Sequence, residues 1–146
     1  MASAQQQSGG CLCGAVRFSA TPADDEVSAC HCSMCRRWSA GPFLVRDCGT
    51  SLTIEDTPSL GAYRSSEWAE RAFCKTCGTP LYYRLIDRDR YFVSAEAFDD
   101  LKGNVFTTQI FIDEKPAYYD FANATHNMTG AEVFAQFAPG NAANSD

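Results

Sequence analysis

The sequence predicts a mainly β protein with antiparallel sheets and one or two short helices. Three observations support this fold class. Short runs of alternating apolar and polar residues recur at roughly ten-residue spacing, Gly, Pro, Asp and Ser separate them, and no long stretch has helical periodicity. Hydrophobic residues make up 45% of the 146-residue chain and charged residues 21%, which is enough apolar material for a folded core.

Six segments carry the strand pattern. In chain order they are residues 15–18, 42–46, 52–55, 81–84, 91–94 and 106–112. The second is a short apolar run, and the others alternate or are rich in β-branched and aromatic side chains, which favour a pleated, half-buried surface.

Two short helices are predicted outside these strands. One covers Ser33–Ser39, with Ser33 as a candidate N-cap. The other covers residues 129–137, where Thr129 and Glu132 have the spacing of a capping box.

The length predicts one domain, which we place over residues 10–138. Residues 1–9 and 139–146 are rich in small and polar side chains, and we expect both segments to be loose. The first ten residues contain no basic or apolar segment, and no apolar run approaches the ~20 residues of a membrane helix. We therefore expect a cytoplasmic protein without membrane association.

The charge balance argues against a nucleic-acid partner. The chain has 12 Lys and Arg against 18 Asp and Glu, a formal net charge of −6. Affinity for phosphate backbones depends on an excess of Lys and Arg, so a broad nucleic-acid surface is not expected.

The eight cysteines are the main chemical feature of the sequence. Seven of them fall into three close groups, which are Cys11 with Cys13, Cys30 with Cys32 and Cys35, and Cys74 with Cys77. In a reducing compartment, closely spaced thiols are metal ligands or redox groups more often than disulfides. Disulfides in an exported protein are the alternative.

The spacing divides these seven cysteines into four and three. A CxxC turn followed by Gly, as at Cys74 and Cys77, supplies two thiolates to one ion, and Cys11 and Cys13 are a suitable second pair. Four thiolates close a tetrahedral site, which is typical of structural zinc. The CxCxxC group leaves a fourth position open, which is typical of catalytic zinc. We expect two zinc ions per chain, with iron–sulfur chemistry as an alternative.

Other arrangements of these residues stay open. Cys48 could complete the three-thiolate site and make it structural. His31 could also ligate, although between two ligating cysteines of an extended strand it would point to the opposite face. Cys74 and Cys77 could form a redox pair, although the βαβ pattern of thioredoxin-like chemistry is missing.

Three motifs together resemble the glutathione-dependent formaldehyde-activating enzymes, a family whose domain also occurs in centromere protein V. They are Gly-Cys-Leu-Cys-Gly at residues 10–14, Cys-His-Cys-Ser-Met-Cys-Arg-Arg-Trp at 30–38 and Phe-Cys-Lys-Thr-Cys-Gly-Thr-Pro-Leu at 73–81. The resemblance covers residues 9–122. It implies an Mss4-like zinc-binding β fold. It assigns a structural zinc to Cys11, Cys13, Cys74 and Cys77, and a second, open zinc with a catalytic role to Cys30, Cys32 and Cys35.

The resemblance also implies an activity and its substrates. The activity is that of a carbon–sulfur lyase similar to S-(hydroxymethyl)glutathione synthase. It would add glutathione or another small thiol to formaldehyde or a related small carbonyl compound, or reverse that addition. The alternative is a non-catalytic zinc-binding domain that binds a partner. The sequence leaves the true substrate and the oligomeric state open.

One departure from the family concerns the proton chemistry. Gln109 stands where members often carry a His, and Gln cannot titrate. The remaining candidates for protonating the adduct oxygen are water, His31 and, less well placed, His126.

Three basic residues near the cysteine motifs, Arg36, Arg37 and Lys75, are candidates for contacting the carboxylates of a peptide thiol. Each could equally be a solvated surface charge. We expect Trp38 to be a core residue rather than a substrate platform.

Overall fold

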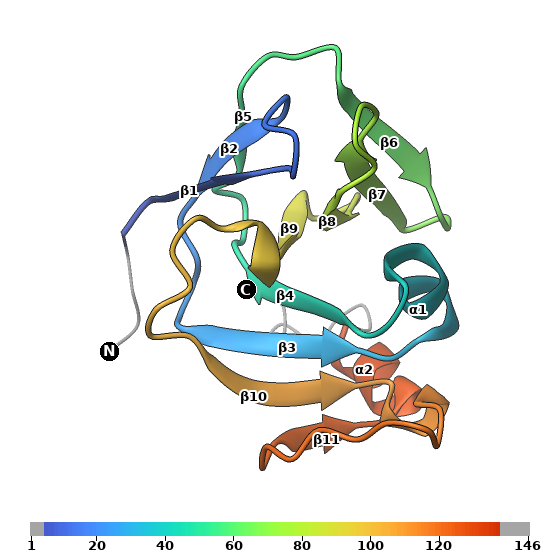
Figure 1. The fold of residues 1–146 in the computed structure, drawn as a ribbon. Coiled ribbons are helices and arrows are strands. Elements are labelled where there is room, and N and C mark those ends of the chain that lie inside the picture. The colour runs from blue at the N-terminus through green and yellow to red at the C-terminus, as the bar shows by residue number, and fades with distance from the viewer. Residues whose placement is uncertain (1–4, 138–146) are drawn as a thin grey trace. The chain divides into compact units, whose positions relative to one another are not determined.

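The computed structural model describes residues 5–137 and has the mainly β, predominantly antiparallel architecture that the sequence predicts (Figure 1). The chain divides into two compact units. The first contains the residues up to Val27 together with Leu44–Val105, and the second contains Ser28–Phe43 and the residues from Phe106 onward. The single domain over residues 10–138 stays a prediction.

The first unit contains two sets of antiparallel strands. A three-stranded sheet has the order β1-β2-β5, and a second run has the order β4-β9-β8-β7-β6. The first sheet consists of β1 (Gln7–Gly10), β2 (Arg17–Ala20) and β5 (Thr53–Ile54). The second run consists of β4 (Phe43–Asp47), β6 (Leu60–Arg64), β7 (Ala69–Cys74), β8 (Pro80–Leu85) and β9 (Arg90–Ser94), which a 3-10 turn, η1 (Ala95–Ala97), follows.

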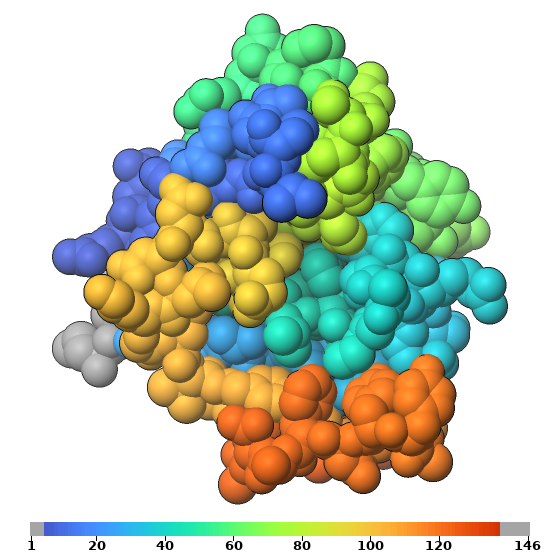
Figure 2. All heavy atoms as spheres, in the orientation of Figure 1, coloured from blue at the N-terminus to red at the C-terminus, as the bar shows by residue number. Residues whose placement is uncertain are grey.

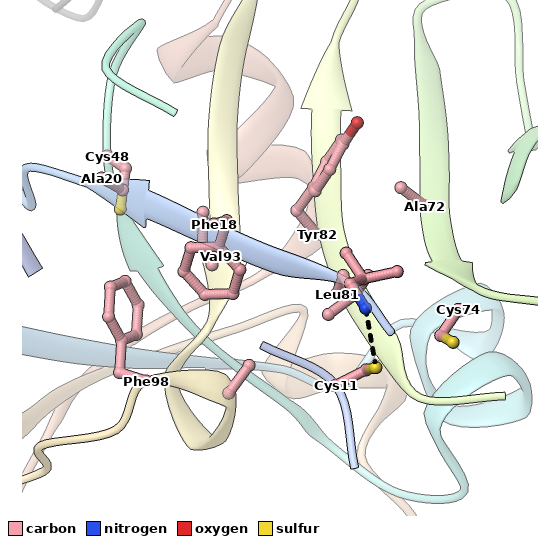
Figure 3. Close-up of a cluster of buried hydrophobic side chains, with 12 residues drawn as sticks. Cys11, Phe18, Ala20, Cys48, Ala72, Cys74, Leu81, Tyr82, Val93 and Phe98 are labelled. Carbon is pink, nitrogen blue, oxygen red and sulfur yellow. Dashed lines mark hydrogen bonds between the residues drawn. The ribbon is translucent and has the colours of Figure 1, made fainter. Parts of the chain in front are cut away.

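A hydrophobic core joins the two strand sets of this unit (Figure 3). Phe18 from β2 meets Phe98 edge to face, with ring centroids 5.3 Å apart. Leu81 from β8 and Val93 from β9 are fully buried beside them. Burying each such side chain stabilises the folded state by about 1.5–3 kcal/mol. The core therefore fixes the positions of its strands and of the turns that follow them.

The second unit is smaller and carries both helices. Its strands have the order β11-β10-β3, and β10 and β11 run parallel. Its elements are β3 (Glu26–Cys30), α1 (Ser33–Ser39), β10 (Val105–Ile110), the 3-10 turn η2 (Ile112–Glu114), β11 (His126–Met128) and α2 (Gly130–Gln136). No helix within residues 5–137 is long and apolar enough to cross a membrane.

Both predicted helices are present, with one correction at a cap. The N-cap of α1 is Cys32 rather than Ser33, and its sulfur accepts a hydrogen bond from the backbone N–H of Cys35. The predicted capping box of α2 forms, because the Thr129 hydroxyl accepts from the Glu132 N–H and the Glu132 carboxylate accepts from the Thr129 N–H.

The six predicted strands correspond to β2, β4, β5, β8, β9 and β10. The predictions missed β1, β3, β6, β7 and β11. Strand β1 begins at Gln7, inside the segment expected to be loose. The predicted tail at residues 139–146 lies outside the described residues.

Candidate metal centres

The first unit brings four cysteines from two distant parts of the chain together. The sulfur atoms of Cys11, Cys13, Cys74 and Cys77 all lie within 4.8 Å of one another. The Cys11 and Cys13 sulfurs are 3.6 Å apart, and those of Cys13 and Cys74 are 3.8 Å apart. A zinc–sulfur bond of ~2.3 Å gives a tetrahedron with sulfur–sulfur edges of about 3.8 Å, whereas a disulfide needs about 2.05 Å. These four residues therefore fit a closed metal site.

Two turns present these sulfurs. Cys74 ends β7, and Gly78, with a φ of +84°, lets its own N–H return to the Cys74 carbonyl at 2.8 Å. The Cys77 N–H points to the Cys74 sulfur at 3.4 Å, and the Val16 N–H points to the Cys11 sulfur at 3.3 Å. Such N–H donors stabilise thiolates and orient them toward an ion.

Thr79, a residue that the sequence reasoning did not single out, connects the two turns. Its hydroxyl oxygen accepts from the Leu12 N–H at 3.1 Å and lies 3.1 Å from the Cys77 sulfur. The hydrogen bonds from the Thr79 hydroxyl and N–H lower the pKa of Cys77 to about 5. Cys77 is thus favoured as a thiolate, the form that binds a metal. The sequence signal that could have identified this role is the position of Thr79, directly after the CxxC-Gly turn.

The second unit contains the three-cysteine cluster. Cys30 ends β3, Cys32 caps α1 and Cys35 lies in its first turn. All three are buried, and their sulfurs lie within 4.8 Å of one another. The neighbouring Cys32 and Cys35 thiols, together with burial, hold the pKa of Cys30 far above its usual range. Three thiolates this close in a buried place are unfavourable unless a cation compensates their charge, so this cluster also could hold a metal ion.

Cys48 belongs to neither cluster. Its side chain is 2% exposed and lies in the core of the first unit, and burial raises the pKa of its thiol to about 12. The suggestion that Cys48 completes the three-thiolate site therefore has no support in this structure, and the residue is a packed apolar side chain.

His31 is fully buried, and both of its ring nitrogens have partners within the second unit. Its Nε2 lies 2.8 Å from Oε1 of Gln109, and its Nδ1 lies 2.8 Å from the Tyr119 hydroxyl. The Gln109 amide nitrogen donates to the Thr125 hydroxyl at 2.8 Å. A carbonyl oxygen only accepts, so His31 carries its proton on Nε2 and Nδ1 accepts from Tyr119. Burial lowers the pKa of His31, which favours this neutral ring.

These contacts answer two open points of the sequence. With both nitrogens engaged, His31 has no lone pair available for a metal. Gln109 does not leave a gap where the family often has His; it is the hydrogen-bond partner that fixes the His31 tautomer. His126, the other candidate proton donor, is an exposed residue of β11.

A cavity of about 580 Å³ lies beside α1 in the second unit. Its lining residues are Ser33, Arg36, Arg37, Ala40, Gly41, Pro42, Tyr118 and Tyr119. The segments that supply them, α1 with its C-terminal turn (cyan) and the chain after β10 (orange), lie next to each other at the surface (Figure 2).

Two further residues from the sequence analysis, Trp38 and Lys75, are also placed. Trp38 is half-buried and packs edge to face on Phe43, with ring centroids 5.2 Å apart; its role as a core residue stays a prediction. Lys75 is exposed beside the four-cysteine cluster and does not line this cavity.

Comparisons with known proteins agree with this picture. A family model described as glutathione-dependent formaldehyde-activating enzyme matches residues 6–114. A protein of Schizosaccharomyces pombe (strain 972 / ATCC 24843) named as an uncharacterized lyase is 40% identical over 126 residues, which are 86% of this chain and 92% of that protein. The crystal structure of a Rhodobacter sphaeroides protein matches with a TM-score of 0.56 and 23% identity, over 68% of this chain and 99% of that one, and supports the fold.

Proposed function

Because the chain belongs to the glutathione-dependent formaldehyde-activating enzyme family, we propose that it is a zinc-dependent carbon–sulfur lyase. Its substrates would be adducts of a small thiol, such as glutathione, with formaldehyde or a related small carbonyl compound. The observation that carries this proposal is the presence of two separate sulfur clusters, one of four and one of three, in a chain of this family. The lyase name of the 40% identical relative supports the reaction class.

The two clusters would have different tasks. Cys11, Cys13, Cys74 and Cys77 would fill all four positions of a structural zinc, whereas Cys30, Cys32 and Cys35 would leave one position free. A zinc ion in the second cluster would act as a Lewis acid that lowers the pKa of a thiol taking the free position. The Cys35 N–H, which donates to the Cys32 sulfur at 3.3 Å, would help to keep this ligand set in place.

In the addition direction, the substrate thiolate attacks the carbonyl carbon, a carbon–sulfur bond forms and the carbonyl oxygen takes up a proton. In the reverse direction that bond breaks and the hydroxyl proton leaves. We assign this proton exchange to water. His31 is not suited to this exchange, because it is buried and both of its ring nitrogens are hydrogen-bonded within the protein. Water can reach the rim of the cavity, where the Tyr118 side chain is 84% exposed.

Exchange NMR on formaldehyde and glutathione tests the function. Zinc-loaded protein should raise the rate of adduct formation and breakdown above the spontaneous rate. Cys32→Ser should abolish the increase, because it removes a ligand of the open site, and Cys48→Ala should keep it. If no acceleration is found with several thiols and aldehydes, the proposal fails and a non-catalytic binding domain is the better description.

A further inference from the structure

We propose that Gln109 and Tyr119 are positioning residues for a metal ion in the three-cysteine cluster. They act through His31, the residue between Cys30 and Cys32, and neither touches the ion. Their removal therefore loosens the ligand set without deleting a ligand. The inference rests on the metal site of the proposed function and not on the lyase reaction.

Both backbone polar groups of His31 are hydrogen-bonded within the second unit. Its N–H donates to the Ile110 carbonyl at the end of β10, at 3.1 Å, and its carbonyl accepts from Arg36 Nε of α1 at 2.8 Å. Rotation of either peptide unit would break one of these bonds. The two peptide units that join His31 to Cys30 and Cys32 are therefore fixed.

The imidazole ring of His31 is held as firmly as its backbone. Its Nε2–H donates to Gln109 Oε1 and its Nδ1 accepts from the Tyr119 hydroxyl, each at 2.8 Å, in a fully buried position. The ring also packs on Tyr119 and Phe121, with centroids 5.6 and 6.1 Å away. Turning the ring would leave two buried nitrogens without partners, which is unfavourable. All four polar groups of this residue thus resist movement.

The two partners of the ring are themselves anchored. Gln109 is buried, and its amide nitrogen donates to the Thr125 hydroxyl at 2.8 Å. Lys115 orients Tyr119, because its Nζ donates to the Tyr119 carbonyl and lies 5.1 Å from the centre of the Tyr119 ring. The same Nζ donates to the Pro116 carbonyl at 2.9 Å. The imidazole ring is therefore held by fixed neighbours.

This arrangement acts on the metal ligands because His31 is bonded to two of them. Cys30 ends β3 and Cys32 has extended backbone angles, and successive side chains of an extended segment point to opposite sides. A ring held on one side therefore sets the positions of both sulfurs on the other, within the cluster whose three sulfurs lie within 4.8 Å of one another. Groups that orient ligands in this way typically change metal affinity by roughly 10- to 100-fold when they are removed.

Cobalt-substituted protein tests the proposal without a catalytic step. Co²⁺ accepts thiolate ligands as zinc does, and its visible absorption depends on its coordination geometry. Protein produced in cobalt medium should carry the ion in both clusters. Cys32→Ser lacks one ligand of the three-cysteine cluster, so subtracting its spectrum from that of the unmodified protein leaves the spectrum of this cluster.

Gln109→Leu and Tyr119→Phe should each change this difference spectrum and weaken retention of the cluster's metal against a chelator roughly tenfold. Tyr118→Phe removes the neighbouring hydroxyl from a side chain that is 84% exposed, and should change neither measurement. Thr129→Ala removes the N-cap of α2 in the same unit and controls for a general loss of stability. It should also leave the spectrum and the metal retention unchanged.

The proposal is overturned if Gln109→Leu and Tyr119→Phe keep the spectrum and the metal retention of the unmodified protein, or if the two controls change them equally. Should Gln109→Leu not fold, Tyr119→Phe, which removes a single oxygen atom, decides the outcome alone. Identical spectra of the unmodified protein and Cys32→Ser would reject this inference together with the metal site of the proposed function. An intact cobalt site without accelerated thiol–aldehyde exchange would reject the lyase reaction alone.

Discussion

Gln109 is 5% exposed, and both ends of its amide are hydrogen-bonded. Its oxygen accepts from His31, and its nitrogen donates to Thr125, which in turn donates to the Asn127 side chain at 2.7 Å. The Gln109 amide therefore determines which group donates and which accepts in a series of four hydrogen bonds. The series runs through Asn127, Thr125, Gln109, His31 and Tyr119. The sequence motif shows only that Gln109 cannot titrate; its partners lie 78 and 16 residues away and become visible only in the fold.

Gln109→Leu should lower the free energy of unfolding by about 1–3 kcal/mol, because the buried Nε2–H of His31 loses its acceptor. Urea unfolding followed by circular dichroism measures the change. Gln6→Leu makes the same replacement at an exposed position and should stay within about 0.5 kcal/mol of the unmodified protein. Equal effects of the two variants would contradict the buried network.

Cys48 should be chemically silent in the folded protein. With a pKa of about 12, only about one thiol in 10⁴ is ionised at pH 8, and the side chain is buried. The thiolate is the reactive form, so reactivity should rise only as the pH approaches the raised pKa or when the chain unfolds. Mass spectrometry after iodoacetamide treatment should find Cys48 unmodified at pH 8 and alkylated in denaturant. Rapid alkylation of the folded protein at pH 8 would contradict its place in the core.

At the scale of elements, local chemistry explains which parts of the fold were predictable. The capping box of α2 acts over four residues, and the helix starts where the sequence places it. Strand β7 was missed because its buried residues do not alternate regularly: the register shifts between Ala72 and Phe73, and the buried Arg71 packs its guanidinium over the Tyr83 ring at 5.0 Å. Strand β1 was missed because it consists of small and polar residues, which do not give a strand pattern. The reason for a small residue at position 9 is a contact made only in the fold, since a Cβ atom on Gly9 would lie 2.3 Å from the Ala97 carbonyl oxygen.

The helix cap gives a prediction at this scale. Thr129→Ala should lower the free energy of unfolding by about 1 kcal/mol, because the Glu132 N–H loses its acceptor and the reciprocal pair is broken. Thr129→Ser keeps the hydroxyl and should cost much less. Hydrogen exchange of the α2 amides measures local opening; unchanged protection in Thr129→Ala would show that the cap does not hold this helix.

At the scale of the whole molecule, each compact unit carries one sulfur cluster. The four-cysteine cluster joins residues 11 and 77, so a metal there would close a long loop and stabilise the first unit. The three-cysteine cluster spans six consecutive residues and closes almost no loop, so its loss should cost little folding energy. Motif spacing predicts each close cysteine group, because each CxC and CxxC is local, whereas Cys13 and Cys74 are 61 residues apart and their meeting is seen only in the fold. The cavity beside α1 was not predictable as a site, since residues 33–42 and 118–119 meet only in the fold.

Metal content of purified variants, measured with folding by circular dichroism, tests the central claim of one closed and one open zinc site most directly. The unmodified protein and Cys48→Ala should each contain two zinc ions per chain. Cys32→Ser should contain about one and keep the β spectrum, whereas Cys77→Ser should lose structure together with its metal. The account would be contradicted if Cys32→Ser and Cys77→Ser lost metal and structure alike, or if Cys48→Ala lost a zinc ion while remaining folded.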